Sequence, residues 1–146
     1  MSVAIGSDHA GFNLKEFVRK HLESKNIDII DFGTADEQST DYPDYAVKVG
    51  RAVAEKEAAW GIVICGTGIG VSIVANKLKG IRAALCCSEY MAEMARKHND
   101  ANVLAMGGRT TSPDIAKRIV DIFLSTDFEG GKHSVRVGKI HSLTKR

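Results

Sequence analysis

The sequence contains little proline, few aromatic residues and no paired cysteines. Only 2 prolines are present, and 6% of the residues are aromatic. The 3 cysteines, Cys65, Cys86 and Cys87, are an odd number without a CxxC pair, which predicts neither a disulfide framework nor a zinc ribbon. Cys86 and Cys87 lie near the end of an expected strand, and we interpret both as small packing residues.

Long apolar runs and an excess of charge of one sign are also missing. No apolar segment reaches the length that crosses a bilayer, and the first residues lack the basic and apolar regions of a secretory signal. With 20 Lys and Arg against 18 Asp and Glu, the formal net charge is +2. We therefore expect a cytoplasmic protein that binds neither nucleic acid nor a membrane. An anionic ligand would have to be held by local groups.

Short apolar runs alternate with amphipathic stretches and predict a single domain over residues 1–146. Strands are expected at 3–5, 27–32, 60–64, 81–86 and 103–106, and helices at 12–24, 45–53, 71–77, 91–98 and 113–123. This alternation predicts an α/β fold, a Rossmann-like three-layer α/β/α sandwich with a five-stranded parallel sheet. The polar stretch 34–44, which contains Pro43, is expected to be the longest loop.

The tail from Ser134 onward is expected to form an extra C-terminal amphipathic helix. No strand follows it to return the chain to the sheet. Its apolar side must therefore pack on its own domain or on a second chain, and the second arrangement would make a dimer.

The stretch Gly61–Gly70, GIVICGTGIG, joins an expected strand to an expected helix through a glycine-rich loop. It is not a dinucleotide fingerprint, whose third glycine would fall at Val71, and it lacks the Gly-Lys-Ser/Thr ending of a phosphate loop. Its N–H groups suit a small oxyanion, although a tight turn that only needs glycine explains the same pattern. A lone cysteine is usually a packing residue, but at a helix N-terminus Cys65 would become a usable base or nucleophile.

Residues that follow parallel strands share one edge of the sheet. We expect that edge to carry the possible chemical groups of the chain, including two residues just before the fifth strand: Asp8, His9, Cys65, Thr67, Arg109, His98 and Asn99. Asp8 is equally well placed as an N-cap, and either histidine could be a capping or surface residue. Lys132, His133 and Arg136 are spaced to share one face of a turn, either as a solvated helix start or as cations for an anionic substrate.

Several ordered motifs resemble the ribose-5-phosphate isomerase B family, whose broader group includes the galactose-6-phosphate isomerase subunits. The motifs cover nearly the whole chain and are SDHAG at 7–11, DYPD at 41–44, GIVICGTGIG at 61–70, ANK at 75–77, RAA at 82–84, HNDANVLAMGGR at 98–109 and EGGKH at 129–133. The resemblance implies an aldose–ketose isomerase of the non-oxidative pentose phosphate pathway. It would interconvert ribose 5-phosphate and ribulose 5-phosphate through an enediolate, with no metal and no organic cofactor.

The resemblance also assigns roles by position. Cys65 resembles the base that moves the proton between C2 and C1, Thr67 resembles its helper at the oxygens, and His98 with Asp8 resembles the pair that opens the sugar ring. The remaining residues resemble ligands of the enediolate, sugar or phosphate: His9, Tyr42, Gly66, Gly68, Ile69, Gly70, Asn99, Arg109, Lys132 and Arg136. Family members are dimers or dimer-based tetramers with sites between subunits, which implies a homodimer or homotetramer here.

One departure from the family pattern keeps the substrate open. Lys132 stands where many members have arginine, and lysine cannot form a bidentate fork on phosphate. We expect weaker or differently shaped phosphate recognition, with tolerance shifted toward six-carbon sugars. A galactose- or allose-6-phosphate isomerase is the alternative, although Asp8-His9 and His98-Asn99 favour the ribose type.

Two other classes of protein fit less well. A sugar-phosphate-binding regulator without turnover would not need a base such as Cys65 beside an anion site. A flavodoxin-like flavin carrier would need an aromatic clamp, and Gly66–Gly70 contains no aromatic residue.

Overall fold

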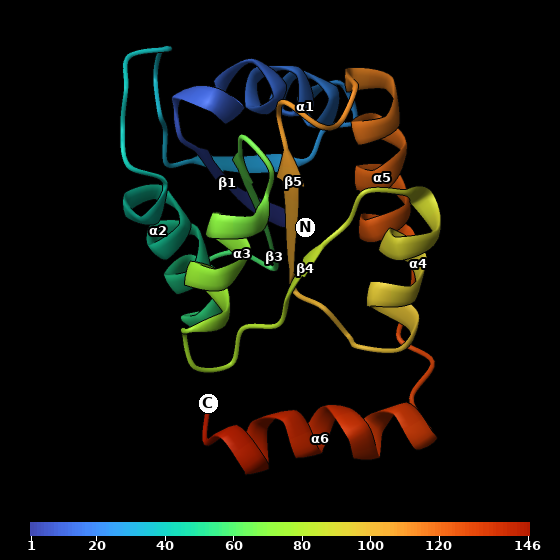
Figure 1. Ribbon diagram of the computed structural model, residues 1–146. Helices are drawn as coiled ribbons and strands as arrows, with labels where there is room; N and C mark the ends of the chain where they lie inside the picture. The colour runs from blue at the N-terminus through green and yellow to red at the C-terminus, as the bar shows by residue number, and fades with distance from the viewer.

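Five strands form one parallel sheet in the computed structural model, which describes all of residues 1–146 (Figure 1). The strands are β1 Ser2–Ser7, β2 Asp28–Asp31, β3 Trp60–Cys65, β4 Ala83–Leu85 and β5 Val103–Gly107. Their order across the sheet is β2-β1-β3-β5-β4, and each neighbouring pair is parallel. The three central strands are buried almost throughout, as expected for strands covered on both faces, whereas the edge strands β2 and β4 are only partly buried.

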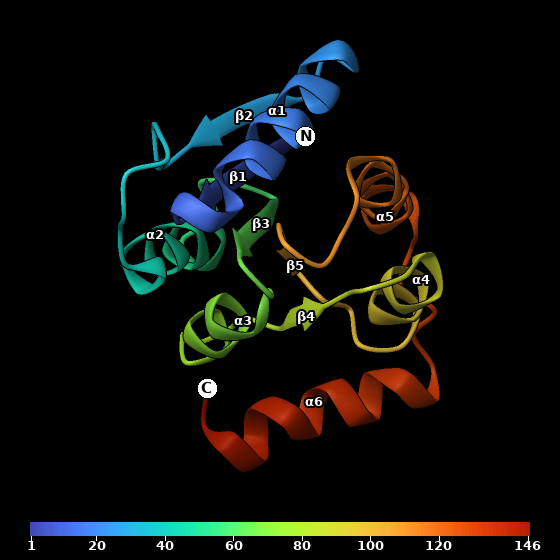
Figure 2. The same ribbon diagram turned by 45° about the horizontal axis from the view of Figure 1, so that its top comes forward.

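Helices cover both faces of the sheet and confirm the predicted three layers (Figure 2). On one face lie α1 Phe12–Ser24, α4 Glu89–Lys97 and α5 Pro113–Ser125, and on the other lie α2 Tyr42–Ala54 and α3 Ile69–Asn76. A short 3-10 helix, η1 His9–Gly11, connects β1 to α1. These helices therefore cover the faces of the sheet and leave the ends of the strands free of the three layers.

Alternation along β3 divides its side chains between the two faces. Ile62 and Ile64 pack in the cluster with α1, α4 and α5, whereas Val63 and Cys65 pack in the cluster with α2 and α3. This period of two is the ordinary geometry of a strand. It places the Cys65 thiol on the α3 side, at the point where β3 ends.

Two local expectations need correction. Pro43 lies in the first turn of α2 and not in a loop, because the first N–H groups of a helix have no intrahelical partner and proline lacks that group. Cys86 is buried, and this burial, with a smaller effect from the neighbouring Cys87, raises the pKa of its thiol to about 12. Cys87 is exposed and is therefore not a packing residue.

The last helix, α6 Lys132–Thr144, lies apart from the three layers, at the end of the sheet where the strands begin (Figure 1). His133 is its only buried residue, whereas Val135 and Leu143 are 62% and 79% exposed. Near its C-terminal end, His141 Nε2 accepts a hydrogen bond from the Arg82 guanidinium at 2.8 Å. The helix is thus attached to its own domain at a few points, with apolar side chains left uncovered. None of the helices is both long enough and apolar enough to span a membrane.

Candidate active site

An open pocket of about 490 Å³ lies where β1, β3 and β5 end, a volume that fits a small ligand. Its lining residues come from η1 and the residue before it, α2, the end of β3, the loop that follows, α3 and the turn after β5. They are Asp8, His9, Ala10, Tyr42, Cys65, Gly66, Thr67, Ile69, Gly70, Ile73 and Arg109. The expectation that residues after parallel strands meet at one edge is confirmed for Asp8, His9, Cys65, Thr67 and Arg109.

The thiol of Cys65 is held by the loop that follows it. Its Sγ accepts a hydrogen bond from the N–H of Gly68 at 3.2 Å, and the Cys65 side chain is buried. Gly68 has φ of 82°, and a Cβ there would lie 2.8 Å from the carbonyl carbon of Met106. Only glycine fits this position, because an added methyl group would meet backbone that cannot move aside. The Gly68 N–H therefore points at the sulfur atom.

The end of β5 fixes the path of the same loop. The N–H of Gly108 donates to the carbonyl of Cys65 at 2.7 Å, and the N–H of Arg109 donates to the carbonyl of Gly66 at 3.0 Å. The N–H of Ile69 donates to the Thr67 hydroxyl at 3.2 Å. In the free protein the N–H groups of Gly68 and Ile69 are thus paired with side chains of their own loop. An oxyanion would have to take over or share these donors.

Two larger side chains border the loop closely. A Cβ on Gly70 would lie 2.7 Å from the ring of Tyr42, and a Cβ on Gly66 would lie 3.3 Å from Nη1 of Arg109. The aromatic ring and the guanidinium therefore sit directly against the glycine backbone. A cation and a row of N–H groups next to a thiol make this pocket suited to an anionic ligand.

Asp8 performs the capping role that the sequence left open. Its Oδ1 accepts a hydrogen bond from the N–H of Gly11 at 3.0 Å and so caps η1, and the residue is 6% exposed. His9 accepts a hydrogen bond at Nδ1 from the N–H of Thr40 at 3.2 Å. Both side chains are therefore fixed by backbone groups before any ligand is bound.

The prediction that His98 and Asn99 share this edge is wrong for a single chain. Both residues precede β5, so they lie where that strand begins, at the opposite end of the sheet from Cys65. Lys132 and Arg136 also lie outside the pocket, on α6. Nor do the three basic residues share one face, because His133 is buried whereas Lys132 and Arg136 are exposed.

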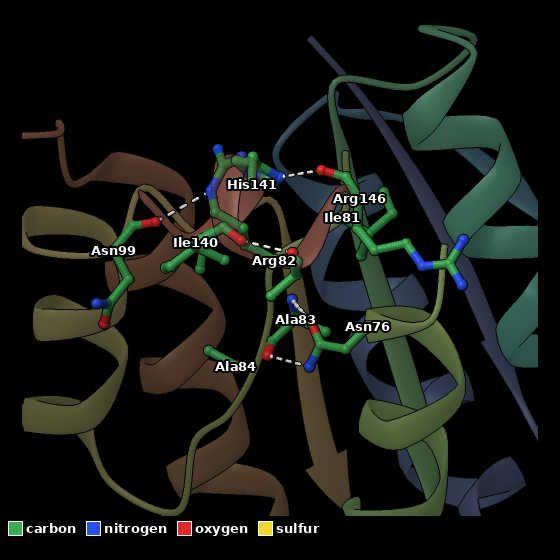
Figure 3. Close-up of a pocket in the computed structure, with 11 residues that line it drawn as sticks. Asn76, Ile81, Arg82, Ala83, Ala84, Asn99, Ile140, His141 and Arg146 are labelled. Atoms are coloured by element: carbon green, nitrogen blue, oxygen red, sulfur yellow. Dashed lines mark hydrogen bonds between the residues drawn. The ribbon is translucent and has the colours of Figure 1, made fainter. Parts of the chain in front are cut away.

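Asn99 lines a second pocket of about 350 Å³, between α6 and the segments that precede β4 and β5 (Figure 3). Arg82 spans this pocket, donating through Nε to the Asn99 carbonyl at 3.1 Å and through Nη1 to His141. Burial lowers the pKa of the Arg82 guanidinium, an effect that the nearby Asp100 carboxylate opposes. The polar groups here hold α6 against the domain.

Three possible metal ligands meet beside α6. Atoms of His98, Glu129 and His133 lie within 4.8 Å of one another. However, the two imidazole rings are stacked, with planes only 10° from parallel. A metal bound to both rings would have to lie in both planes, and nearly parallel planes do not meet close to the rings. The cluster as it stands is not arranged to bind a metal.

Comparison with known proteins identifies the family. The Ribose/Galactose Isomerase family matches residues 3–140. The chain belongs to this family. The chain is similar to ribose-5-phosphate isomerase B of Escherichia coli strain K12. The two are 48% identical over 144 residues, which are 99% of this chain and 97% of that protein.

Solved structures confirm both the family and the predicted fold. Ribose-5-phosphate isomerase B of Clostridium thermocellum is 52% identical with a TM-score of 0.98, over 99% of this chain and 98% of that one. The enzyme of Mycoplasma genitalium with bound ribulose-5-phosphate is 41% identical with a TM-score of 0.94, over 99% and 97% of the two chains. Both proteins therefore have the same fold as this chain.

Some residues that shape the pocket are not predicted from the sequence. Ile73 lines it from α3, one helical turn beyond Ile69, and the 3.6-residue period could have indicated this. Thr40 contacts His9 through its backbone, a role that no side-chain motif reveals.

Proposed function

We propose that the chain is an aldose–ketose isomerase that interconverts D-ribose 5-phosphate and D-ribulose 5-phosphate. The observation that carries the proposal is the Cys65 thiol, which accepts the Gly68 N–H in a pocket with Arg109 and the glycine loop. A base beside donors for an oxyanion is what proton transfer next to a carbonyl requires. The similar proteins of Escherichia coli and Clostridium thermocellum, both named ribose-5-phosphate isomerase B, support the five-carbon substrate over a galactose or allose phosphate.

In the proposed reaction the Cys65 thiolate removes the proton from C2 of the open-chain aldose and returns it to C1. The carbonyl oxygen O1 takes up negative charge as the C1–C2 double bond forms, and N–H groups of Gly66–Gly70 stabilise it. Loss of one such donor in comparable sites costs about 3 kcal/mol of barrier. The Thr67 hydroxyl carries the proton between O2 and O1, so that the reaction is a net isomerisation. The proposed steps use neither a metal nor an organic cofactor.

We further propose that the site is completed by a second copy of the chain. His98, Asn99, Lys132 and Arg136 lie at the far end of the sheet from Cys65, which supports a site shared between two chains in a homodimer or a dimer-based homotetramer. His98 of one protomer would then open the sugar ring with Asp8 of its partner. The exposed Val135 and Leu143 on α6 give the second chain apolar surface to cover.

Mixed dimers test the shared site. We expect Cys65→Ala and the double variant Lys132→Ala/Arg136→Ala to be inactive separately. Mixing equal amounts under conditions of subunit exchange should restore about a quarter of the wild-type activity, since half of the dimers then contain one intact site out of two. A mixture as inactive as its components would show that one chain supplies the whole site.

An isomerase assay on three sugar phosphates tests the reaction. We expect ribose 5-phosphate to be the best substrate, ahead of allose 6-phosphate and galactose 6-phosphate, with the same rate in the presence of a chelator. Full activity of Cys65→Ala would contradict the role of the base, and loss on chelation would contradict metal-free catalysis. We also propose that this single-domain enzyme, residues 1–146, acts in the non-oxidative pentose phosphate pathway of the cytoplasm.

A further inference from the structure

A loop that no motif assigns to the reaction controls one ring nitrogen of His9. The chain between β2 and α2 passes over η1, and the N–H of Thr40 donates to His9 Nδ1 at 3.2 Å. His9 itself lines the pocket beside Cys65. The loop therefore contacts the candidate site through a hydrogen bond to an imidazole.

This contact determines where the ring of His9 can carry a proton. A backbone amide is only a donor, so Nδ1 must offer its lone pair to it, and the proton of the neutral imidazole must then be on Nε2. A proton on Nδ1 would face the N–H of Thr40 and break the contact. The hydrogen bond thus selects one tautomer, in which Nε2–H is the group left to donate to a ligand.

The loop is attached to the rest of the domain near its start and near its middle. Near its start, the N–H of Thr34 donates to the Ser7 carbonyl and the N–H of Ser7 donates to the Gly33 carbonyl, each at 2.8 Å. Farther on, Nδ2 of Asn13 in α1 donates to Oε1 of Glu37 at 2.7 Å. These contacts hold the amide of Thr40 over His9. The Thr40 hydroxyl is buried without a partner, so the contribution of Thr40 here comes from its backbone.

We infer that Thr40 is a positioning residue, whose backbone N–H holds His9 in the Nε2–H tautomer so that His9 donates one hydrogen bond to an oxygen of the sugar phosphate. The inference rests on the proposed isomerase function. It gives His9 a different role from the guanidinium of Arg109 in the same pocket: the ring supplies a directed hydrogen bond, and Arg109 supplies the charge.

Nitrogen-15 NMR of the ring nitrogens tests the tautomer directly in the full-length wild-type protein. The spectrum is recorded at about pH 8, where an ordinary histidine is neutral, and the His9 signals are assigned by their loss in His9→Gln. We expect Nδ1 to give the signal of an unprotonated nitrogen and Nε2 that of a protonated one. The opposite pattern, or an even mixture, would overturn the inference. This measurement needs no activity, so it stands apart from the outcome of the isomerase assay.

A pair of variants at one position tests the effect on the reaction. Thr40→Pro removes the N–H, whereas Thr40→Ala keeps it and removes only the side chain. We expect Thr40→Pro to lose the single tautomer and to have kcat/KM for ribose 5-phosphate about tenfold below that of Thr40→Ala, mainly through KM. Equal kcat/KM and equal ring signals in the two variants would contradict the role of the amide. If Thr40→Pro does not fold by circular dichroism, the wild-type spectrum decides the matter.

Discussion

The imidazole rings of His98 and His133 stack face to face, with their centroids 4.2 Å apart. The stack joins the end of α4 to the start of α6, and His133 is the only residue of α6 that the domain buries. Lys132 and Arg136 flank it on the same helix, and Glu129 lies 3.6 Å from His133 Nε2. One end of α6 is therefore attached through a stacked pair of imidazole rings.

Acid should release α6. Burial, and then the positive charges of His98, Lys132 and Arg136, lower the pKa of His133 below its ordinary 6.5, while Glu129 opposes them. A released His133 binds protons more readily, so the attachment is complete above about pH 6.5 and weakens as the pH falls below it. Hydrogen exchange of the α6 amides, corrected for intrinsic rates, should be faster at about pH 5.5 than at about pH 8. The α1 amides are the control, and unchanged α6 protection would contradict the prediction.

Replacing the proposed base should abolish most of the activity. Cys65→Ser keeps the approximate size of the side chain but replaces the thiol with a hydroxyl, a much weaker acid that is not ionised near neutral pH. We expect kcat to fall by about 10²- to 10⁴-fold, the usual contribution of a general base. The matched control is Cys87→Ser, since Cys87 is exposed and lies outside the pocket. Equal losses in the two variants would show that the effect is not specific to the site.

Two glycines with nearly the same positive φ separate strain from steric clash. Gly68 has φ of 82° and Gly80 has φ of 81°, but a Cβ would meet Leu85 at 2.6 Å at the first position and nothing within 4 Å at the second. We expect Gly80→Ala to cost about 1–2 kcal/mol of stability through strain alone. Gly68→Ala should cost more and should also lower kcat, because the clash would displace the N–H that donates to Cys65. Urea unfolding measures both free energies, and equal costs would contradict the clash.

Lys132 should limit the recognition of phosphate. Lys132→Arg introduces a planar fork that can bind two phosphate oxygens, so KM for ribose 5-phosphate should fall by about fivefold at unchanged kcat. Lys139→Arg makes the same chemical change on the same helix and lies outside the family motif, and its KM should equal that of the wild type. Indistinguishable values for the two variants would remove the idea that Lys132 tunes specificity.

The sequence correctly predicted the position of those site residues that follow the C-terminal ends of the strands. Asp8, Cys65 and Arg109 come directly after apolar runs, and parallel strands bring such residues to one edge whatever their order in the sheet. His98 and Asn99 were misplaced because they adjoin the start of β5, and a strand of this length separates its two ends by about 17 Å. A residue that is close to a strand in sequence can therefore be placed in the site only when one knows whether it adjoins the start or the end of that strand.

Other features could not be read from the sequence. The apolar runs carry no information on strand order, so the position of β5 between β3 and β4 became visible only in the structure. The contact between Thr40 and His9 joins a backbone group to a side chain 31 positions away, and residue type does not encode it. The glycines were predicted better, because a left-handed conformation at Gly68 favours one residue type.

The strand order also determines how the chain can fold while it is being made. A ribosome releases β4 before β5, yet β4 pairs only with β5. A nascent chain can therefore assemble β2, β1 and β3, but β4 has no partner until Gly107 has left the exit tunnel. The same moment delivers Gly108 and Arg109, whose N–H groups fix the carbonyls of Cys65 and Gly66. Completion of the sheet and completion of the loop around the thiol therefore become possible at the same late point of synthesis.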